Sequence, residues 1–203
     1  MNSLILSLIV SYLLGSIPTA FLVGGAVKKI DIRKYGSGNV GATNVFRVVG
    51  KKWGIAVLIF DALKGALAVF LVPRFFSQTS ASLFLTSLLC GIAAIAGHTW
   101  TIWLGFKGGK GVAASAGVFL ALAPKAAGTA LLVWILIFSL KRYVSLASIV
   151  TAVTFPLWVV LFYRNEDKFR VLFPTGILLA VFILYTHRSN IQRLKSGSEK
   201  KLL

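Results

Sequence analysis

Long apolar runs separated by short polar segments dominate the pattern of this chain. A helix needs about 20 apolar residues to cross a bilayer. Seven apolar runs occur, and they cover residues 4–27, 53–72, 83–104, 112–123, 126–140, 144–162 and 172–186. The first run has no basic segment before it and is longer than the apolar part of a signal peptide, so we expect a retained helix. The pattern predicts an all-α polytopic membrane protein, with residues 1–203 forming a single integral-membrane domain.

The fourth and fifth runs are the weakest of the series. At 1.5 Å per residue, both are shorter than a hydrocarbon core of about 30 Å. They could instead form one kinked helix, interrupted at Pro124 and Lys125. Cytoplasmic loops carry an excess of Lys and Arg, so the distribution of basic residues can distinguish the two arrangements.

Seven spans separate the basic residues better than six spans do. With seven spans, 16 basic residues lie on one side and 5 on the other, whereas six spans give 12 and 9. We therefore expect seven transmembrane helices with short or broken fourth and fifth spans. The N-terminus is expected outside and the C-terminus in the cytoplasm.

Composition narrows the class of protein further. Apolar residues make up 57% of the chain and charged residues 13%, with 22 Lys and Arg against 5 Asp and Glu. Basic residues spaced by apolar runs cannot form one soluble basic face, so we expect no nucleic-acid partner. The single Cys90 excludes a disulfide framework, and five carboxylates make a metal site built on an acidic cluster improbable. We expect the lipid bilayer as a partner, with no metal and no cofactor.

Three polar blocks interrupt this apolar pattern, at residues 36–44, 106–111 and 187–193. The predicted topology places all three on the cytoplasmic side. Together they supply glycine backbone, hydroxyls, amides and cations. Glycine-rich turns and helix N-termini present amide groups to anions, while Arg and Lys contribute a fork and a point charge. The blocks therefore predict binding of more than one phosphate group.

Each block also has a plainer interpretation. Lys107 and Lys110 could be basic anchors at the membrane surface, with Gly108 and Gly109 forming a tight turn. The glycine spacing at 36–41 matches a dinucleotide fingerprint, but a membrane helix precedes it instead of a strand, so we reject that match.

Three ionisable residues lie within the predicted spans and not in the blocks. Asp61 and Lys64 are three residues apart in the second span and are expected to form a pair with a structural role. His98 lies near the cytoplasmic end of the third span. An intramembrane ionisable group suggests function by default, although a hydrogen bond between helices explains His98 comparably well.

The residues of the three blocks closely resemble a known family over nearly the whole chain. The resemblance rests on Ser37, Gly38, Asn39, Thr43, Asn44 and Arg47, on Gly97, His98 and the stretch 106–113, and on His187, Arg188, Asn190, Arg193, Leu194, Gly197 and Glu199. In this order and spacing they resemble the bacterial acyl-phosphate–glycerol-3-phosphate acyltransferase family, PlsY.

The resemblance implies a seven-span enzyme of the bacterial inner membrane with a cytoplasmic active site. Such an enzyme transfers a fatty acyl group from acyl phosphate to the 1-hydroxyl of glycerol 3-phosphate. The products are lysophosphatidic acid and phosphate, in the first step of bacterial phospholipid synthesis. Neither acyl-CoA nor acyl carrier protein is the donor.

The resemblance also implies a set of site residues. Those expected to be catalytic are Ser37, Arg47, Lys107 and His187. Those expected to bind substrate are Gly38, Asn39, Thr43, Asn44, His98, Gly108, Gly109, Lys110, Gly111, Ser145, Arg188, Asn190 and Arg193.

A division of these residues between the two substrates follows as a hypothesis. The acyl phosphate would be held by Ser37, Thr43, Asn44 and the amides of 108–111, and the glycerol 3-phosphate by Arg47, Lys107, Asn190 and Arg193. Neither His98 nor His187 has an Asp five residues later, where acyltransferases with soluble donors place one. A substrate phosphate oxygen is therefore the expected proton acceptor, with His187 as the less favoured base.

A transporter or exchanger of phosphorylated metabolites is the main alternative. It would need basic residues near the membrane midplane, lining a cavity with alternating access. The predicted spans contain one Lys and one Asp, and the other cations gather near the surfaces. This distribution favours the enzyme.

Overall fold

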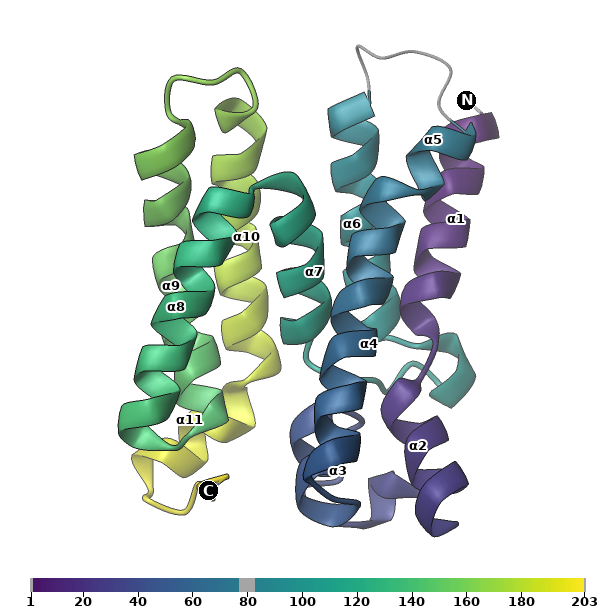
Figure 1. Cartoon of the computed structure of the whole chain (residues 1–203), viewed down its shortest axis with the longest axis vertical. Coiled ribbons are helices and arrows are strands. Elements are labelled where there is room, and N and C mark those ends of the chain that lie inside the picture. The colour runs from purple at the N-terminus through teal and green to yellow at the C-terminus, as the bar shows by residue number, and fades with distance from the viewer. Residues whose placement is uncertain (1, 77–82, 203) are drawn as a thin grey trace. The chain divides into compact units, whose positions relative to one another are not determined.

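A computed structural model describes residues 2–76 and 83–202, and these residues are helical with no strand among them. The chain divides into two compact units, Met1–Leu122 and Ala123–Leu203. Figure 1 shows the helices of each unit coloured along the chain. The absence of strands in the described ranges agrees with the all-α prediction.

The first unit contains three long helices and several short ones. The long helices are α1 (Asn2–Ser16), α4 (Lys51–Phe70) and α6 (Leu83–Thr99). Between and beside them lie α2 (Thr19–Lys28), η1 (Ile32–Lys34), α3 (Ala42–Val48), α5 (Val72–Phe76), η3 (Ile102–Leu104) and α7 (Val112–Leu122). Helix α1 packs on α6, and α4 packs on both α6 and α7.

Glycines allow two of these helix pairs to approach closely. A Cβ atom added at Gly15 of α1 would collide with the backbone of Ala94 in α6, and one at Gly97 of α6 would collide with the backbone of Tyr12. The α4–α7 pair is built in the same way, with Gly65 facing Ala114 and Gly117 facing Ala62. Small residues that let backbones meet are typical of helix packing in membranes, where apolar burial provides little drive.

The apolar run at 4–27 is interrupted and is not one continuous helix. Helix α1 ends at Ser16 and α2 begins at Thr19, with Pro18 between them. Proline has no amide hydrogen and therefore leaves carbonyl groups of the preceding turn without helical partners. Side chains bind two carbonyls at this break: the Thr101 hydroxyl donates to the Ser16 carbonyl at 2.5 Å, and the Lys64 ammonium donates at 2.9 Å to the Ile17 carbonyl, which also accepts the Thr19 amide. The break is thus satisfied by protein groups inside the candidate span.

The second unit consists of α8 (Pro124–Lys141), α9 (Val144–Tyr163), α10 (Phe169–Thr186) and α11 (Arg188–Lys195). Helix α9 packs against both α8 and α10. Arg142, in the left-handed conformation with φ 63°, ends α8 just before α9 begins. Helix α11 continues directly from the end of α10 and carries the polar residues of the third block.

Six helical segments among the described residues are long and apolar enough to cross a membrane: Ser3–Lys28, Lys51–Phe75, Leu83–Leu104, Pro124–Lys141, Val144–Tyr163 and Phe169–Thr186. Helix α7, with 11 residues, is shorter than these. Helix α8 extends beyond the run 126–140 at both ends and, with 18 residues, is long and apolar enough to be among these six segments. Crossing of the membrane by α7, and with it the seven-span orientation, stays a prediction.

Large apolar side chains cover much of the outside of these helices. Leu58 and Phe60 of α4, Leu132 of α8 and Leu178 of α10 are all exposed. A soluble protein rarely exposes apolar surface on this scale. Hydrocarbon contact accounts for it, and the exposed faces agree with the predicted membrane class.

Candidate functional site

The first polar block is a loop held together by one buried side chain. Asn44, only 1% exposed, accepts a hydrogen bond from the Ser37 amide at 2.9 Å. Its own amide group donates to the carbonyls of Ile32 at 3.2 Å and Tyr35 at 3.0 Å. A Cβ atom at Gly36, where φ is +62°, would collide with the Asn44 side chain. Asn44 therefore shapes the loop that carries Ser37.

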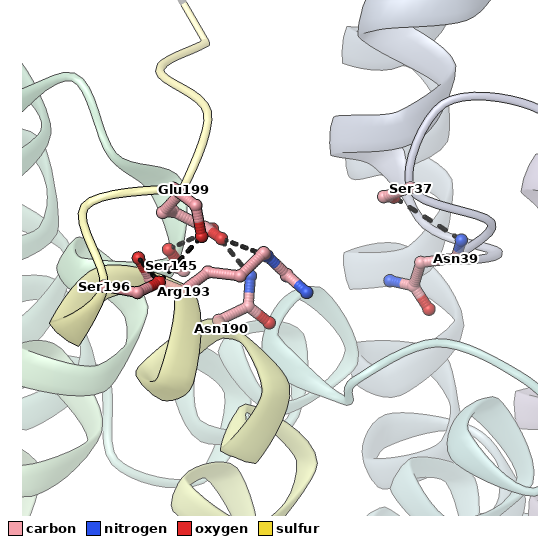
Figure 2. Close-up of polar contacts among 8 residues, drawn as sticks. Ser37, Asn39, Ser145, Asn190, Arg193, Ser196 and Glu199 are labelled. Carbon is pink, nitrogen blue, oxygen red and sulfur yellow. Dashed lines mark hydrogen bonds and ion pairs between the residues drawn. The ribbon is translucent and has the colours of Figure 1, made fainter.

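The candidate substrate groups of this block lie around that loop. Ser37 is exposed, and its hydroxyl accepts a hydrogen bond from the Asn39 amide at 3.5 Å (Figure 2). Gly38 has φ +72°, a left-handed conformation that favours glycine. Thr43 and Arg47 lie on α3, with Thr43 partly buried and Arg47 exposed near the C-terminal end of the helix.

The second block folds back onto the end of α6. The Gly108 amide donates to the Thr99 carbonyl at 2.9 Å, and the Gly109 amide donates to the His98 carbonyl at 3.0 Å. These two amides are therefore engaged within the chain. The first amides of α7, which begins at Val112, have no partner within the helix and face in the direction that favours an anion. Lys107 is exposed beside this turn.

The first unit brings residues of the first two blocks to one small pocket. Val40 of the first block and Gly108 and Gly109 of the second line it, together with His98. Asp61 and Lys64 also reach the pocket. Two blocks far apart in the sequence thus meet at one end of the unit, next to the intramembrane ionisable residues.

The predicted pairing of Asp61 with Lys64 is confirmed. The Lys64 ammonium lies 2.8 Å from the Asp61 carboxylate, and both side chains are almost completely buried. The Thr19 hydroxyl also donates to Asp61, and His98 Nδ1 lies 3.6 Å from the same carboxylate oxygen. His98 therefore faces a carboxylate on the neighbouring helix α4, at a distance longer than a normal hydrogen bond.

In the second unit, Glu199 is the centre of the polar network. Its carboxylate accepts hydrogen bonds from the Ser145 hydroxyl at 2.6 Å, from the Asn190 amide at 2.6 Å and from Arg193 Nε at 2.7 Å (Figure 2). Burial acts to raise the pKa of Glu199, but these three hydrogen bonds outweigh it and hold the pKa below its ordinary value. The carboxylate stays ionised and fixes three predicted substrate residues in one place.

Glu199 itself was not among the predicted site residues, although it belongs to the pattern that carries the family resemblance. The signal in the sequence is a single acidic residue within a basic tail between Lys195 and Lys201. A carboxylate in such surroundings is expected to pair, but its partner could not be chosen from spacing alone.

His187 and Arg188 occupy the junction between α10 and α11. His187 is 4% exposed, and its Nδ1 lies 2.9 Å from the Ile183 carbonyl oxygen. A carbonyl can only accept, so Nδ1 carries the proton and Nε2 carries the lone pair in the neutral ring. The Arg188 guanidinium donates to the Tyr185 carbonyl at 3.1 Å and lies 4.6 Å from the centre of the Tyr185 ring.

Metal ligands do not cluster in the described part of the chain. Within residues 2–76 and 83–202, no three His, Cys, Asp or Glu side chains lie close enough together to hold a metal ion.

These features define a class of protein: a helical, multi-pass membrane protein that presents glycine-rich turns, hydroxyls and cations suited to phosphate. Residues 5–197 match the model of the family described as glycerol-3-phosphate acyltransferase. The chain belongs to this family, and the PlsY resemblance of its polar blocks is confirmed.

Individual relatives cover nearly the whole chain. A glycerol-3-phosphate acyltransferase of Desulforudis audaxviator is 45% identical in an alignment of 204 positions that covers 98% of this chain and 96% of the relative. One of Chlorobium limicola is 39% identical in an alignment of 231 positions, gaps included, that covers 100% of this chain and 97% of the relative.

Solved structures agree with these relatives. The crystal structure of PlsY (YgiH), an integral membrane glycerol 3-phosphate acyltransferase, in its glycerol 3-phosphate form has a TM-score of 0.85 to this chain. It is 39% identical and the match covers 98% of this chain and 95% of that one. The lysophosphatidic acid form gives a TM-score of 0.84 at 38% identity, with the same coverage.

Proposed function

We propose that this protein transfers a fatty acyl group from acyl phosphate to the 1-hydroxyl of glycerol 3-phosphate, forming lysophosphatidic acid and inorganic phosphate. The observation that carries the proposal is the match to glycerol-3-phosphate acyltransferases over 5–197. Solved relatives that are titled as the glycerol 3-phosphate and lysophosphatidic acid forms support the acceptor and the product. The proposed location is the bacterial inner membrane, with seven crossings and the reaction on the cytoplasmic side.

The reaction needs positioning and charge stabilisation more than it needs an activated nucleophile. The acceptor hydroxyl oxygen forms a bond to the acyl carbon, the bond from that carbon to the phosphate oxygen breaks, and the hydroxyl proton leaves. Acyl phosphate is a mixed anhydride with phosphate as a good leaving group. Holding the reactants together and stabilising the developing charge can therefore supply much of the rate.

The proposed roles follow the chemistry of each group. Ser37, Thr43 and the turn at 108–111 hold the acyl phosphate, with Asn44 keeping the Ser37 loop in shape. The proposed ligands of the glycerol 3-phosphate are cations and an amide: Arg47, Lys107, Asn190 and Arg193. Arg193 and Asn190 are held at Glu199, which supports their placement before substrate arrives.

The remaining predicted substrate residues are assigned to neither substrate in the proposal. They are Gly38, Asn39, His98, Ser145 and Arg188.

A substrate phosphate oxygen is the proposed proton acceptor. His187 is the alternative base, since the hydrogen bond from its Nδ1 to Ile183 leaves the lone pair on Nε2. The proposed donor is acyl phosphate and neither acyl-CoA nor acyl carrier protein, and the proposed reaction uses no metal and no cofactor.

A phosphate-release assay with the purified protein, palmitoyl phosphate and glycerol 3-phosphate tests this function. We expect phosphate release that requires both substrates, persists in EDTA and yields lysophosphatidic acid by mass spectrometry. Replacing palmitoyl phosphate with palmitoyl-CoA should give no product. Product formed from the CoA ester, or activity lost with EDTA, would contradict the proposed donor or the metal-independent reaction.

Lys107→Met tests the proposed site within the same assay. Removing the cation should lower kcat/KM by about 100-fold or more, as is typical when a group that stabilises transition-state charge is lost. Lys51→Met, at the start of α4, is the matched control for loss of an exposed cation and should retain activity. If Lys107→Met stays active, Lys107 is a membrane-surface anchor. Glycerol 3-phosphate flux into proteoliposomes, without product, would identify the transporter alternative.

A further inference from the structure

Asp61 is a carboxylate inside a candidate membrane span, and its surroundings extend beyond a simple ion pair. It is 1% exposed on α4. Lys64 neutralises it at 2.8 Å, and the Thr19 hydroxyl donates to it from the start of α2. The Lys64 ammonium also donates to the Ile17 carbonyl at the helix break. Asp61 thus lies at the point where α4 meets the interrupted first span.

The third neighbour of Asp61 is His98 at the end of α6. The 3.6 Å separation between His98 Nδ1 and the carboxylate oxygen is too long for a normal hydrogen bond. Both side chains are nearly completely buried, so water screens their interaction weakly and the attraction can still orient the ring. The carboxylate therefore faces the Nδ1 side of the imidazole.

The opposite side of the imidazole supports the turn at 107–111. A Cβ atom placed at Gly109 would collide with His98 Nε2, so only glycine lets the backbone lie directly against the ring. The His98 carbonyl accepts the Gly109 amide at 3.0 Å, and the Thr99 carbonyl accepts the Gly108 amide at 2.9 Å. A rotated or displaced ring would move the part of the loop that carries Lys107.

We propose that Asp61 is a positioning residue: by holding the His98 ring against Gly109, it fixes the 107–111 turn in the conformation that binds a substrate phosphate. This inference rests on the proposed function in its last step, because the phosphate is that of an acyl phosphate or of glycerol 3-phosphate. In this proposal Asp61 acts on the turn through His98.

The alternative hypothesis, that Asp61 and Lys64 form an ion pair with only a structural role, predicts a different result. Buried ion pairs can often be replaced by neutral side chains of similar volume with little loss of stability. If Asp61 and Lys64 only stabilise the fold, such a neutral pair will restore activity together with stability. If Asp61 positions His98, activity stays low in a folded protein.

The test uses Asp61→Asn/Lys64→Met, which keeps the site neutral, since either single substitution leaves a buried charge. Monodisperse elution in detergent and a cooperative thermal transition establish folding. We expect kcat/KM to fall roughly tenfold to a hundredfold, because small displacements of positioning groups have effects of this size. Ser11→Ala, at a buried hydroxyl of α1, is the control for altering a buried polar group and should leave kcat/KM within twofold of the parent.

A comparison with His98→Gln shows whether Asp61 acts through the ring. The triple variant should be no less active than His98→Gln alone, because residues that act in series are not additive. A double variant as active as the parent, or losses that multiply in the triple variant, overturns the inference.

Hydrogen exchange of the backbone amides at 106–112 provides a readout that does not depend on acyl transfer. We expect exchange there to be about tenfold faster or more in Asp61→Asn/Lys64→Met than in the parent and in Ser11→Ala. Unchanged exchange overturns the inference even if the parent proves active. If exchange is faster in Asp61→Asn/Lys64→Met but the parent has no acyltransferase activity, the proposed function is refuted. The structural part of the inference, that Asp61 holds the turn through His98, is then kept.

Discussion

The two units each hold a carboxylate among polar partners, but they differ in access to water. The Asp61 side chain is 2% exposed and its counter-ion Lys64 is 6% exposed. The Glu199 side chain is 8% exposed, but its counter-ion Arg193 is 41% exposed. Both carboxylates accept hydrogen bonds from neighbouring side chains, so their hydrogen bonding does not distinguish the two networks. The exposure of the paired cation distinguishes them.

The difference in exposure of the two cations indicates different roles for the two networks. A cation that cannot reach water must keep its partner, because separating the pair leaves a buried charge. A cation that is partly solvated can exchange one anion for another at modest cost. The network in the first unit is therefore suited to holding backbone in place, and that in the second unit to releasing Arg193 toward a phosphate.

The largest expected effect comes from breaking the buried pair. Lys64→Met leaves Asp61 without its counter-ion and removes one of the two donors to the Ile17 carbonyl, the other being the Thr19 amide. We expect a loss of about 3–5 kcal/mol in the free energy of unfolding, the range found when one member of a buried pair is removed. Thermal or denaturant unfolding in detergent measures it. Asp61→Asn/Lys64→Met should be the more stable of the two variants, and a single variant as stable as the parent would contradict the buried-pair account.

A smaller effect is expected from the helix contacts that hold this pair in place. Gly117→Ala places a methyl group against the backbone of Ala62, one residue from Asp61. Overpacking of this kind costs about 1–3 kcal/mol. Gly128→Ala is the matched control in the second unit, because no atom lies within 4 Å of its added Cβ. It should be neutral or slightly stabilising, and equal effects of the two substitutions would show that the α4–α7 contact is not tight.

Glu199→Gln tests the more accessible network. The substitution keeps the shape and removes the charge that Arg193 and Asn190 face. Water can replace part of the lost interaction, so we expect a stability loss of roughly 1–2 kcal/mol, below that of Lys64→Met. We also expect about tenfold lower kcat/KM because Asn190 and Arg193 lose their common anchor.

Glu166→Gln is the control for Glu199→Gln. Glu166 pairs with Lys168 at 2.9 Å, and the side chains of both are substantially exposed. Exposed pairs contribute about 0–1 kcal/mol, so little change is expected in stability or activity. A similar activity loss in the two variants would remove the special role of Glu199.

The smallest effect is the pH dependence of the Glu199 network. The pKa of Glu199 lies below its ordinary value of 4.5, so its contribution to stability is present above pH 4.5 and disappears as the pH falls through the lowered value. The difference in stability between the parent and Glu199→Gln should be constant from about pH 7 to about pH 5 and shrink only at lower pH. Asp31, whose pKa is lowered to about 2 by the Arg33 side chain, is common to both proteins and cancels. A difference that shrinks above pH 5 contradicts the lowered pKa.

Much of this protein could be predicted from local pattern. The apolar runs indicated a membrane protein, and the family was evident from the order of the polar blocks. The pairing of Asp61 with Lys64 followed from their spacing, because residues three apart on a helix are neighbours. Helix ends were less predictable: α8 extends to Pro124 and Lys141, because proline is tolerated in the first turn of a helix and a terminal lysine ends the apolar run without ending the helix.

The sequence by itself determined the membrane class, the family and the residue types that suit phosphate, because apolar length and local spacing are properties of the chain alone. The tertiary structure decided which groups meet. It placed His98, at the end of α6, between Asp61 of α4 and Gly109 of the loop before α7. It also closed Ser145, Asn190 and Arg193 around Glu199. Such contacts depend on the packing of helices that are far apart in the sequence. The partners of a buried carboxylate are therefore set by tertiary packing and not by local spacing.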